Sequence, residues 1–140
     1  MILLVRHGSA GDSAAWRGDD RERPLDSRGR KQAKGLVKEL AQFDPAVVVS
    51  SPYLRCLQTV EPLARSLGAP VDVRAELGYE RPDDETRALV ASLAGITAVV
   101  CGHGGLEVAV LGDDAPKFRK GATLVLDDEL RLVEALRPPA

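Results

Sequence analysis

The sequence predicts a three-layer α/β/α sandwich with a mainly parallel central sheet. Short apolar runs bounded by turn residues alternate with helical patterns along the 140 residues, which is typical of strands and helices around a parallel sheet. The first run is continuously apolar, as expected for a strand that is buried on both faces. The length suits a single domain over residues 1–140, and 44% hydrophobic residues are enough for one globular core.

The first part of the chain should contain one strand, a long loop and one helix. Ile2 to Val5 forms the strand, and the polar stretch from Ser9 to Pro24 is irregular. A loop of this length in so small a domain is usually functional or disordered. Asp26 or Ser27 caps the helix. The inner face of that helix has the three-and-four spacing of buried positions: Gln32, Ala33, Leu36, Val37 and Leu40.

A second strand and a second helix follow. Ala46 to Val49 is the strand, and the serines at 50 and 51 cap a helix that has Pro52 in its first turn. We expect this helix to end near Gly68. Pro62 should kink or split it, because an interior proline removes one backbone hydrogen bond and clashes with the preceding turn.

The rest of the chain should complete the sheet and its second layer of helices. Asp83 or Asp84 caps a helix that ends near Leu93, and a short helix follows the later glycine-rich turn. The last two strands form a hairpin across an acidic turn. The expected ranges are a strand over 71–73, a strand over 97–101, a helix over 106–111, and the hairpin strands over 122–126 and 130–136.

Charge and cysteine content exclude several classes of protein. Nineteen basic and 21 acidic residues leave a net charge of −2, so no overall field favours nucleic acid or an anionic membrane. No apolar run reaches the roughly 18 residues of a membrane span, and the first one is too short for a signal peptide. We therefore expect a cytoplasmic protein. Cys56 and Cys101 alone cannot form a disulfide framework or a four-ligand zinc site.

Three expected strand ends carry the chemically active residues. Arg6-His7-Gly8, then Ser51-Pro52 followed by Arg55, and finally Gly102-His103-Gly104 each come directly after a buried strand. Ligands bind outside the carboxyl ends of the strands in open α/β sheets. If these strands are parallel neighbours, two imidazoles and two guanidiniums converge on one small volume. Such a group suits a dianion, and phosphate is the commonest one.

These motifs resemble those of the histidine phosphatase (phosphoglycerate mutase-like) superfamily. The resemblance rests on Arg6-His7-Gly8, on Ser-Pro-x-x-Arg-x-x-Gln-Thr at 51–59, on Gly102-His103, and on the helix pattern at 25–33. The small size is similar to that of the SixA-like branch. The stretch at 16–25 and the segment at 118–121 look like phosphatase domains fused to Nudix hydrolases in actinobacteria. By association, this resemblance suggests a separate Nudix hydrolase as a partner.

The resemblance implies a role for each motif. His7 would attack phosphorus and form a phosphohistidine, which water then hydrolyses. Arg6, Arg55 and His103 would donate hydrogen bonds to the nonbridging oxygens, and Gly8 would allow close approach of the backbone to the substrate. Because these cationic groups supply the positive charge that a magnesium ion would bring, no metal or other cofactor is expected.

The sequence contains three candidates for the proton donor to the leaving group. Relatives often carry a glutamate after the strand that precedes the penultimate helix, and Glu76 is the first candidate there. Glu80 and Glu85 lie close by in the sequence. The resemblance also implies an alternative without a dedicated acid, in which small members act on phosphoramidates or good leaving groups, which need less protonation.

We therefore expect a metal-independent phosphatase that acts on a phosphomonoester or phosphoramidate. The long loop with Trp16 and several arginines favours a small phosphorylated metabolite or nucleotide as substrate. The compact size favours a different substrate, phosphohistidine on a protein. Two further hypotheses are a phosphate-binding module without catalysis and a two-histidine metalloprotein. We expect a monomer or weak dimer that binds neither nucleic acid nor membrane.

Overall fold

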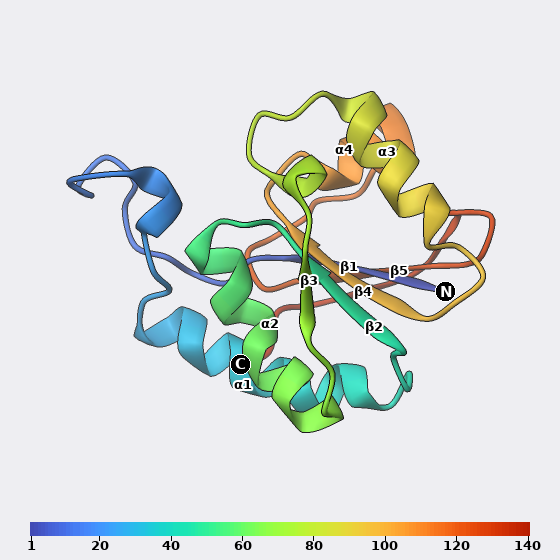
Figure 1. Cartoon of the computed structure of the whole chain (residues 1–140), viewed down its shortest axis with the longest axis horizontal. Helices are drawn as coiled ribbons and strands as arrows, with labels where there is room; N and C mark the ends of the chain where they lie inside the picture. Colours follow the sequence, from blue (N-terminus) through green and yellow to red (C-terminus); the bar gives the residue numbers. More distant parts are fainter.

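The computed structural model describes all residues 1–140 and shows one six-stranded sheet between two layers of helices (Figure 1). The strands are β1 (Ile2–Arg6), β2 (Val47–Ser50), β3 (Val71–Val73), β4 (Ala98–Gly102), β5 (Thr123–Leu126) and β6 (Leu132–Leu136). Their order across the sheet is β3-β2-β4-β1-β5-β6. Strands β1 to β4 run parallel, β5 is antiparallel to β1, and β5 and β6 form an antiparallel hairpin. The predicted mainly parallel α/β/α sandwich is confirmed.

The helices cover the sheet in two pairs. They are α1 (Ser27–Ala41), α2 (Leu54–Leu67), α3 (Asp83–Ser92) and α4 (Leu106–Leu111). Helices α1 and α2 lie together on one face, and α3 and α4 lie on the other (Figure 1). Short 3₁₀ turns interrupt the loops at 20–22, 75–77 and 112–114. No helix is both long enough and apolar enough to span a bilayer.

The central strand β1 is buried on both faces, which explains its continuous apolar run. Leu3 and Val5 pack into the cluster beneath α1 and α2, whereas Ile2 and Leu4 pack into the cluster beneath α3 and α4. Side chains alternate between the two faces of a strand, so a strand covered on both sides needs apolar residues at every position. This core holds the carboxyl end of β1 rigidly in the middle of the sheet.

Two expectations about helix caps were wrong, and the split that was one alternative at Pro62 does not occur. Helix α2 is not split at Pro62, because its buried face, with Val60 and Leu63, packs against the core on both sides of the proline. Ser51 does not cap α2. The helix begins at Leu54 after Tyr53, which makes no side-chain cap, and Pro52 lies outside the first turn. Neither Asp83 nor Asp84 caps α3, since both lie inside its first turn and favour the positive end of the helix dipole from there.

The register of the sheet brings three loops to one edge. Arg6 at the end of β1 pairs with Gly102 at the end of β4, and Ser50 at the end of β2 pairs with Cys101. The residues that follow these three strands therefore emerge side by side. This edge is where the sequence motifs meet.

Candidate active site

The two histidines of the chain face each other at the carboxyl edge of the sheet. Their ring centroids are 5.5 Å apart, with the planes at 65°. The backbone N–H of His7 donates to the carbonyl of Gly102 at 3.0 Å, which ties the loop after β1 to the loop after β4. Both side chains are buried. The two imidazoles therefore lie together at this edge, as the positions of the motifs predicted.

The hydrogen bonding of His7 leaves one ring nitrogen free as a nucleophile. Its Nδ1–H donates to the carbonyl oxygen of Gly8 at 2.8 Å, so the unprotonated nitrogen is Nε2. Burial, together with the nearby charges of His103, Arg55 and Arg6, outweighs this hydrogen bond and lowers the pKa of His7 to about 3. His7 is therefore a neutral imidazole at neutral pH, with the lone pair of Nε2 available.

The ring of His103 is held from several sides. Its Nε2 lies 2.9 Å from the hydroxyl oxygen of Ser51, while its buried Nδ1 has no hydrogen-bond partner. The rings of Tyr53 and Tyr79 pack edge-on against it at centroid distances of 4.7 and 5.4 Å. The protein thus fixes this ring and leaves its buried Nδ1 without a partner.

The two arginines are also partly satisfied by protein groups. Arg6 donates from Nη1 to the carbonyl of Phe118 at 2.8 Å. A Cβ at position 104 would lie 3.0 Å from the Arg6 Cζ, so glycine there lets the guanidinium lie against the His103 loop. Arg55, in the first turn of α2, is 3% exposed and lies over the ring of Tyr53. The Nε atoms of both arginines are buried without a partner.

Gly8 links the nucleophile loop to the helix of Arg55. Its N–H donates to the hydroxyl of Thr59 at 2.9 Å, and that hydroxyl donates to the carbonyl of Arg55 at 2.7 Å. A Cβ at position 8 would lie 3.0 Å from the side-chain oxygen of Gln32. Glycine is needed here for close packing against α1. Its amide is already used within the protein, so the structure does not place it as a free donor to substrate.

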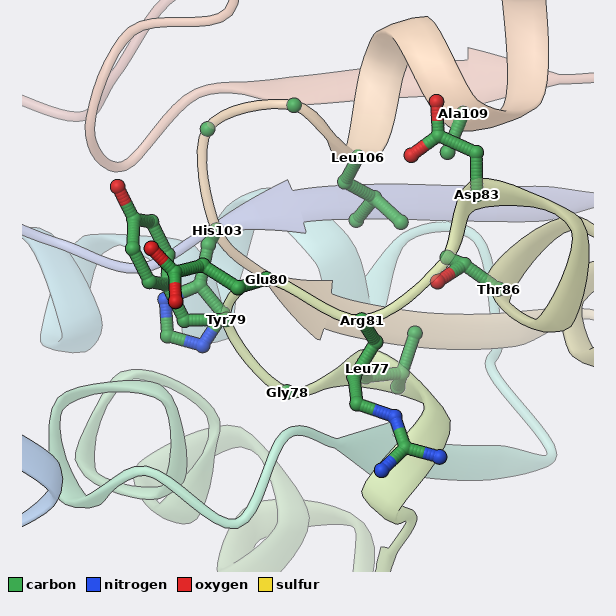
Figure 2. A pocket seen from close by; sticks show the side chains of 12 residues that line it. Leu77, Gly78, Tyr79, Glu80, Arg81, Asp83, Thr86, His103, Leu106 and Ala109 are labelled. Carbon is green, nitrogen blue, oxygen red and sulfur yellow. The ribbon is translucent and has the colours of Figure 1, made fainter.

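The structure separates the three candidate glutamates. Glu76 pairs with Arg74 at 2.8 Å, and a hydrogen bond from its own backbone together with Arg74 lowers the pKa of Glu76. Glu85 pairs with Arg81 at 3.2 Å. Glu80 instead lines a cavity of about 260 Å³ that also contains His103 and Tyr79. Figure 2 shows these three side chains grouped at one end of that cavity, which we name the His103 cavity.

Asp20 is a site residue that sequence reasoning missed. Its carboxylate lies 3.1 Å from Nη2 of Arg55 and 3.0 Å from Nε of Arg23, and its carbonyl accepts from Nη1 of Arg55 at 2.9 Å. Asp20 lies in the 9–24 loop, so this loop reaches the site. No local pattern could have found it, because the contact joins segments 35 residues apart. Thr59, whose hydroxyl links Gly8 to Arg55, is the other such residue. A local pattern could have indicated Thr59, because it lies one helical turn after Arg55 on α2.

The hypothesis of a metal-binding site lacks a set of ligands. No three His, Cys, Asp or Glu side chains converge anywhere in the structure. The unpartnered polar atoms beside His7 are nitrogens of Arg6, Arg55 and His103. Two of these are guanidinium nitrogens, which donate hydrogen bonds and cannot ligate a cation. This donor set suits an oxyanion.

Comparisons with known proteins identify the family of this chain. The family model of the histidine phosphatase superfamily (branch 1) matches residues 2–78. An 8-oxo-(d)GTP phosphatase from Mycolicibacterium smegmatis is 37% identical over an alignment of 155 residues, which covers 99% of this chain and 48% of that protein. The chain thus spans about half the length of this curated relative.

Solved structures show the same fold over nearly the whole chain. The protein histidine phosphatase SixA, complexed with tungstate, superposes with a TM-score of 0.79 at 25% identity, covering 98% of this chain and 96% of that one. A SixA-type protein from Nakamurella multipartitia gives 0.78 at 28% identity, with 99% and 96% covered. Together with the family match, these findings show that the chain belongs to the histidine phosphatase superfamily, branch 1.

Proposed function

We propose that this protein is a phosphatase that hydrolyses a phosphomonoester or phosphoramidate through a phosphohistidine on His7. One observation carries the proposal. A neutral imidazole with a free Nε2 lies beside three buried nitrogens that have no partner, namely Nε of Arg6, Nε of Arg55 and Nδ1 of His103. A nucleophile beside unpaired guanidinium donors supports phosphoryl transfer.

The proposed reaction has two displacements at phosphorus. In the first, the Nε2 lone pair of His7 forms a bond to phosphorus while the bond from phosphorus to the leaving group breaks. Arg6, Arg55 and His103 hold the nonbridging oxygens, whose charge they neutralise without a metal ion. In the second, a water oxygen attacks phosphorus, the electron pair of the P–N bond returns to His7, and phosphate leaves.

Glu80 is the proposed proton donor for leaving groups that need one. Glu80 shares the His103 cavity, whereas the carboxylate of Glu76 is held by Arg74 and its lowered pKa keeps it ionised. Glu80 also adopts a backbone φ of 66°, a left-handed conformation that non-glycine residues seldom adopt. Such conformations cluster at functional sites. The same carboxylate would accept the proton of water in the second displacement.

The proposed substrate is a nucleotide or another small phosphorylated metabolite. Support comes from the relative that acts on 8-oxo-(d)GTP and aligns with 99% of this chain. The likeness to SixA supports the second candidate, phosphohistidine on a protein. Comparison of kcat/KM over nucleotides, sugar phosphates and a phosphohistidine protein distinguishes the two. A preference for the phosphoprotein of about tenfold or more would reverse their order.

The test of the mechanism is hydrolysis of p-nitrophenyl phosphate in EDTA. We expect turnover by the wild-type protein and none by His7→Ala, with an acid-labile, alkali-stable phosphoenzyme trapped only in the wild type. Circular dichroism checks that the variant is folded. If neither protein turned over any phosphorylated compound while both bound phosphate, the chain would be a binding module. An active His7→Ala protein would disprove the nucleophile.

A further inference from the structure

A second hollow, lined in part by Arg6, is strongly cationic. It has a volume of about 620 Å³ and lies between α1, the segment before β5 and the C-terminal residues after β6. We name it the basic groove. Its cationic side chains are Arg6, Arg28, Lys31, Arg119, Lys120 and Arg137.

The cations of the basic groove have no acidic side chains as partners. No Asp or Glu side chain lines it. Ala140, which carries the terminal carboxylate, is also part of the lining, but none of the arginines or lysines of the groove forms an ion pair with it or with any other group. Elsewhere arginines do pair, as Arg65 does with Glu61 and Arg81 with Glu85. On a chain of net charge −2, such a cluster focuses positive potential on one small volume.

The groove is joined to the reaction centre through Arg6 and its neighbours. The N–H of Gly121 lies 3.0 Å from the carbonyls of both Arg6 and His7. This contact ties the segment that carries Arg119 and Lys120 to the backbone of the nucleophile loop. Arg6 therefore belongs to both places: its side chain lines the groove, and its charge acts on His7.

We propose that the basic groove binds the further phosphate groups of a nucleoside oligophosphate whose terminal phosphoryl group is transferred to His7. This inference rests on the proposed function. A phosphate chain carries several charges along its length and needs several cations, and arginine forks match phosphate oxygens. The volume suits a small ligand rather than a polymer. The groove also stabilises the charge that develops on a departing phosphate, which therefore needs no proton.

The test uses the binding of inorganic tripolyphosphate and of orthophosphate, measured by calorimetry in EDTA. The full chain carries His7→Ala, so that the probes are not consumed. We expect tripolyphosphate to bind more tightly than orthophosphate. Charge-assisted hydrogen bonds should be lost in Lys31→Gln/Arg119→Gln, weakening tripolyphosphate by about tenfold and orthophosphate by about twofold or less.

Lys34→Gln/Lys38→Gln is the matched control, because it also removes two positive charges. Both lysines are exposed on the same helix as Lys31 but outside the groove, and their removal should leave both affinities unchanged. Equal weakening by control and groove variants would indicate only a general charge effect and overturn the site. Equal affinities for the two probes would do so as well. Tighter, groove-dependent binding of a single-stranded oligonucleotide would overturn the ligand class.

These outcomes are separable from the fate of the proposed function. Groove-dependent binding of tripolyphosphate without any turnover of p-nitrophenyl phosphate by the wild type would keep the binding site and reject the enzyme. Turnover with no preference for tripolyphosphate would keep the enzyme and reject the groove.

Discussion

The two hollows beside the histidine pair differ in charge. The His103 cavity contains acidic groups, Glu80 and Asp83, together with Arg81, whereas the basic groove contains six cationic side chains and no acidic ones. The difference points to two ways of stabilising a leaving group at one reaction centre. A proton from Glu80 would stabilise an alkoxide leaving group, whereas fixed positive charge would stabilise a phosphate leaving group.

The two arginines of the site also differ in whether an acidic side chain neutralises their charge. Arg55 is paired with Asp20, and Arg6 has no acidic partner. Incoming phosphate therefore meets a charge that is already neutralised at Arg55 and an uncompensated one at Arg6. The predictions below separate these regions, beginning with the largest effect.

Removal of Arg6 should affect both regions at once. Arg6→Ala takes away a donor to the reacting oxygens, and the loss of one such donor typically lowers turnover by about 10² to 10³. We expect a loss of this size in kcat for p-nitrophenyl phosphate, measured in EDTA. Arg28→Ala, which changes an exposed groove arginine further along the chain, is the comparison for simple loss of charge. Equal kinetics for the two variants would contradict a direct role for Arg6.

The acid side of the site should matter only for poor leaving groups. Glu80→Gln should lower kcat for an alkyl phosphate by about 10², because general acids typically contribute at least that factor. The loss should be far smaller for p-nitrophenyl phosphate, whose leaving group needs little protonation. Glu76→Gln is the matched control and should change neither rate. If Glu76→Gln proved the more damaging of the two, the assignment of the proton donor would be reversed.

Burial of His7 should make stability depend on pH. The pKa of His7 falls from 6.5 to about 3 on folding, chiefly because the ring is buried. The unfolded chain therefore binds a proton that the folded chain does not, and stability falls as the pH drops below about 6.5. Between pH 7 and pH 5 this amounts to about 2 kcal/mol. Urea unfolding of wild type and His7→Gln at both pH values measures it.

The difference between the two proteins isolates this contribution, because the carboxylates titrate alike in both. A wild-type protein whose loss of stability equals that of His7→Gln would show that His7 has an ordinary pKa in the folded state.

The smallest expected effect is a change in inhibition by phosphate when the negative charge beside Arg55 is removed. Although partial burial raises the pKa of Asp20, hydrogen bonds and charges from Arg23 and Arg55 outweigh it and lower that pKa, so Asp20 is ionised at neutral pH. Asp20→Asn keeps the backbone contact but removes the charge, which makes Arg55 resemble Arg6. Inorganic phosphate should then inhibit about threefold more tightly, a size typical of partly exposed ion pairs. Weaker inhibition would mean that Asp20 positions Arg55 instead of competing with phosphate.

Much of this architecture could be predicted because its signals are local. The apolar run at 2–5, the cap at Asp26 and the glycine at 68 are each read from neighbouring residues, and the structure has β1, α1 and the end of α2 at those places. The tautomer of His7 is also set locally, by the carbonyl of the next residue, Gly8. Pro62 shows where local signals fail. A proline inside a helix removes one backbone hydrogen bond, but packing on both sides of Pro62 keeps α2 continuous.

The sequence alone determined the alternation of strands and helices, because it depends on residues that are close together in the chain. For the same reason it determined the order of the motifs that contain Arg6-His7, Arg55 and His103. Only the tertiary structure decided which glutamate faces His103, that Asp20 holds Arg55, and that cations from α1 and two distant segments line one groove. The physical reason is that charge acts through space. Its partners are set by strand register and loop placement, which no spacing along the chain records.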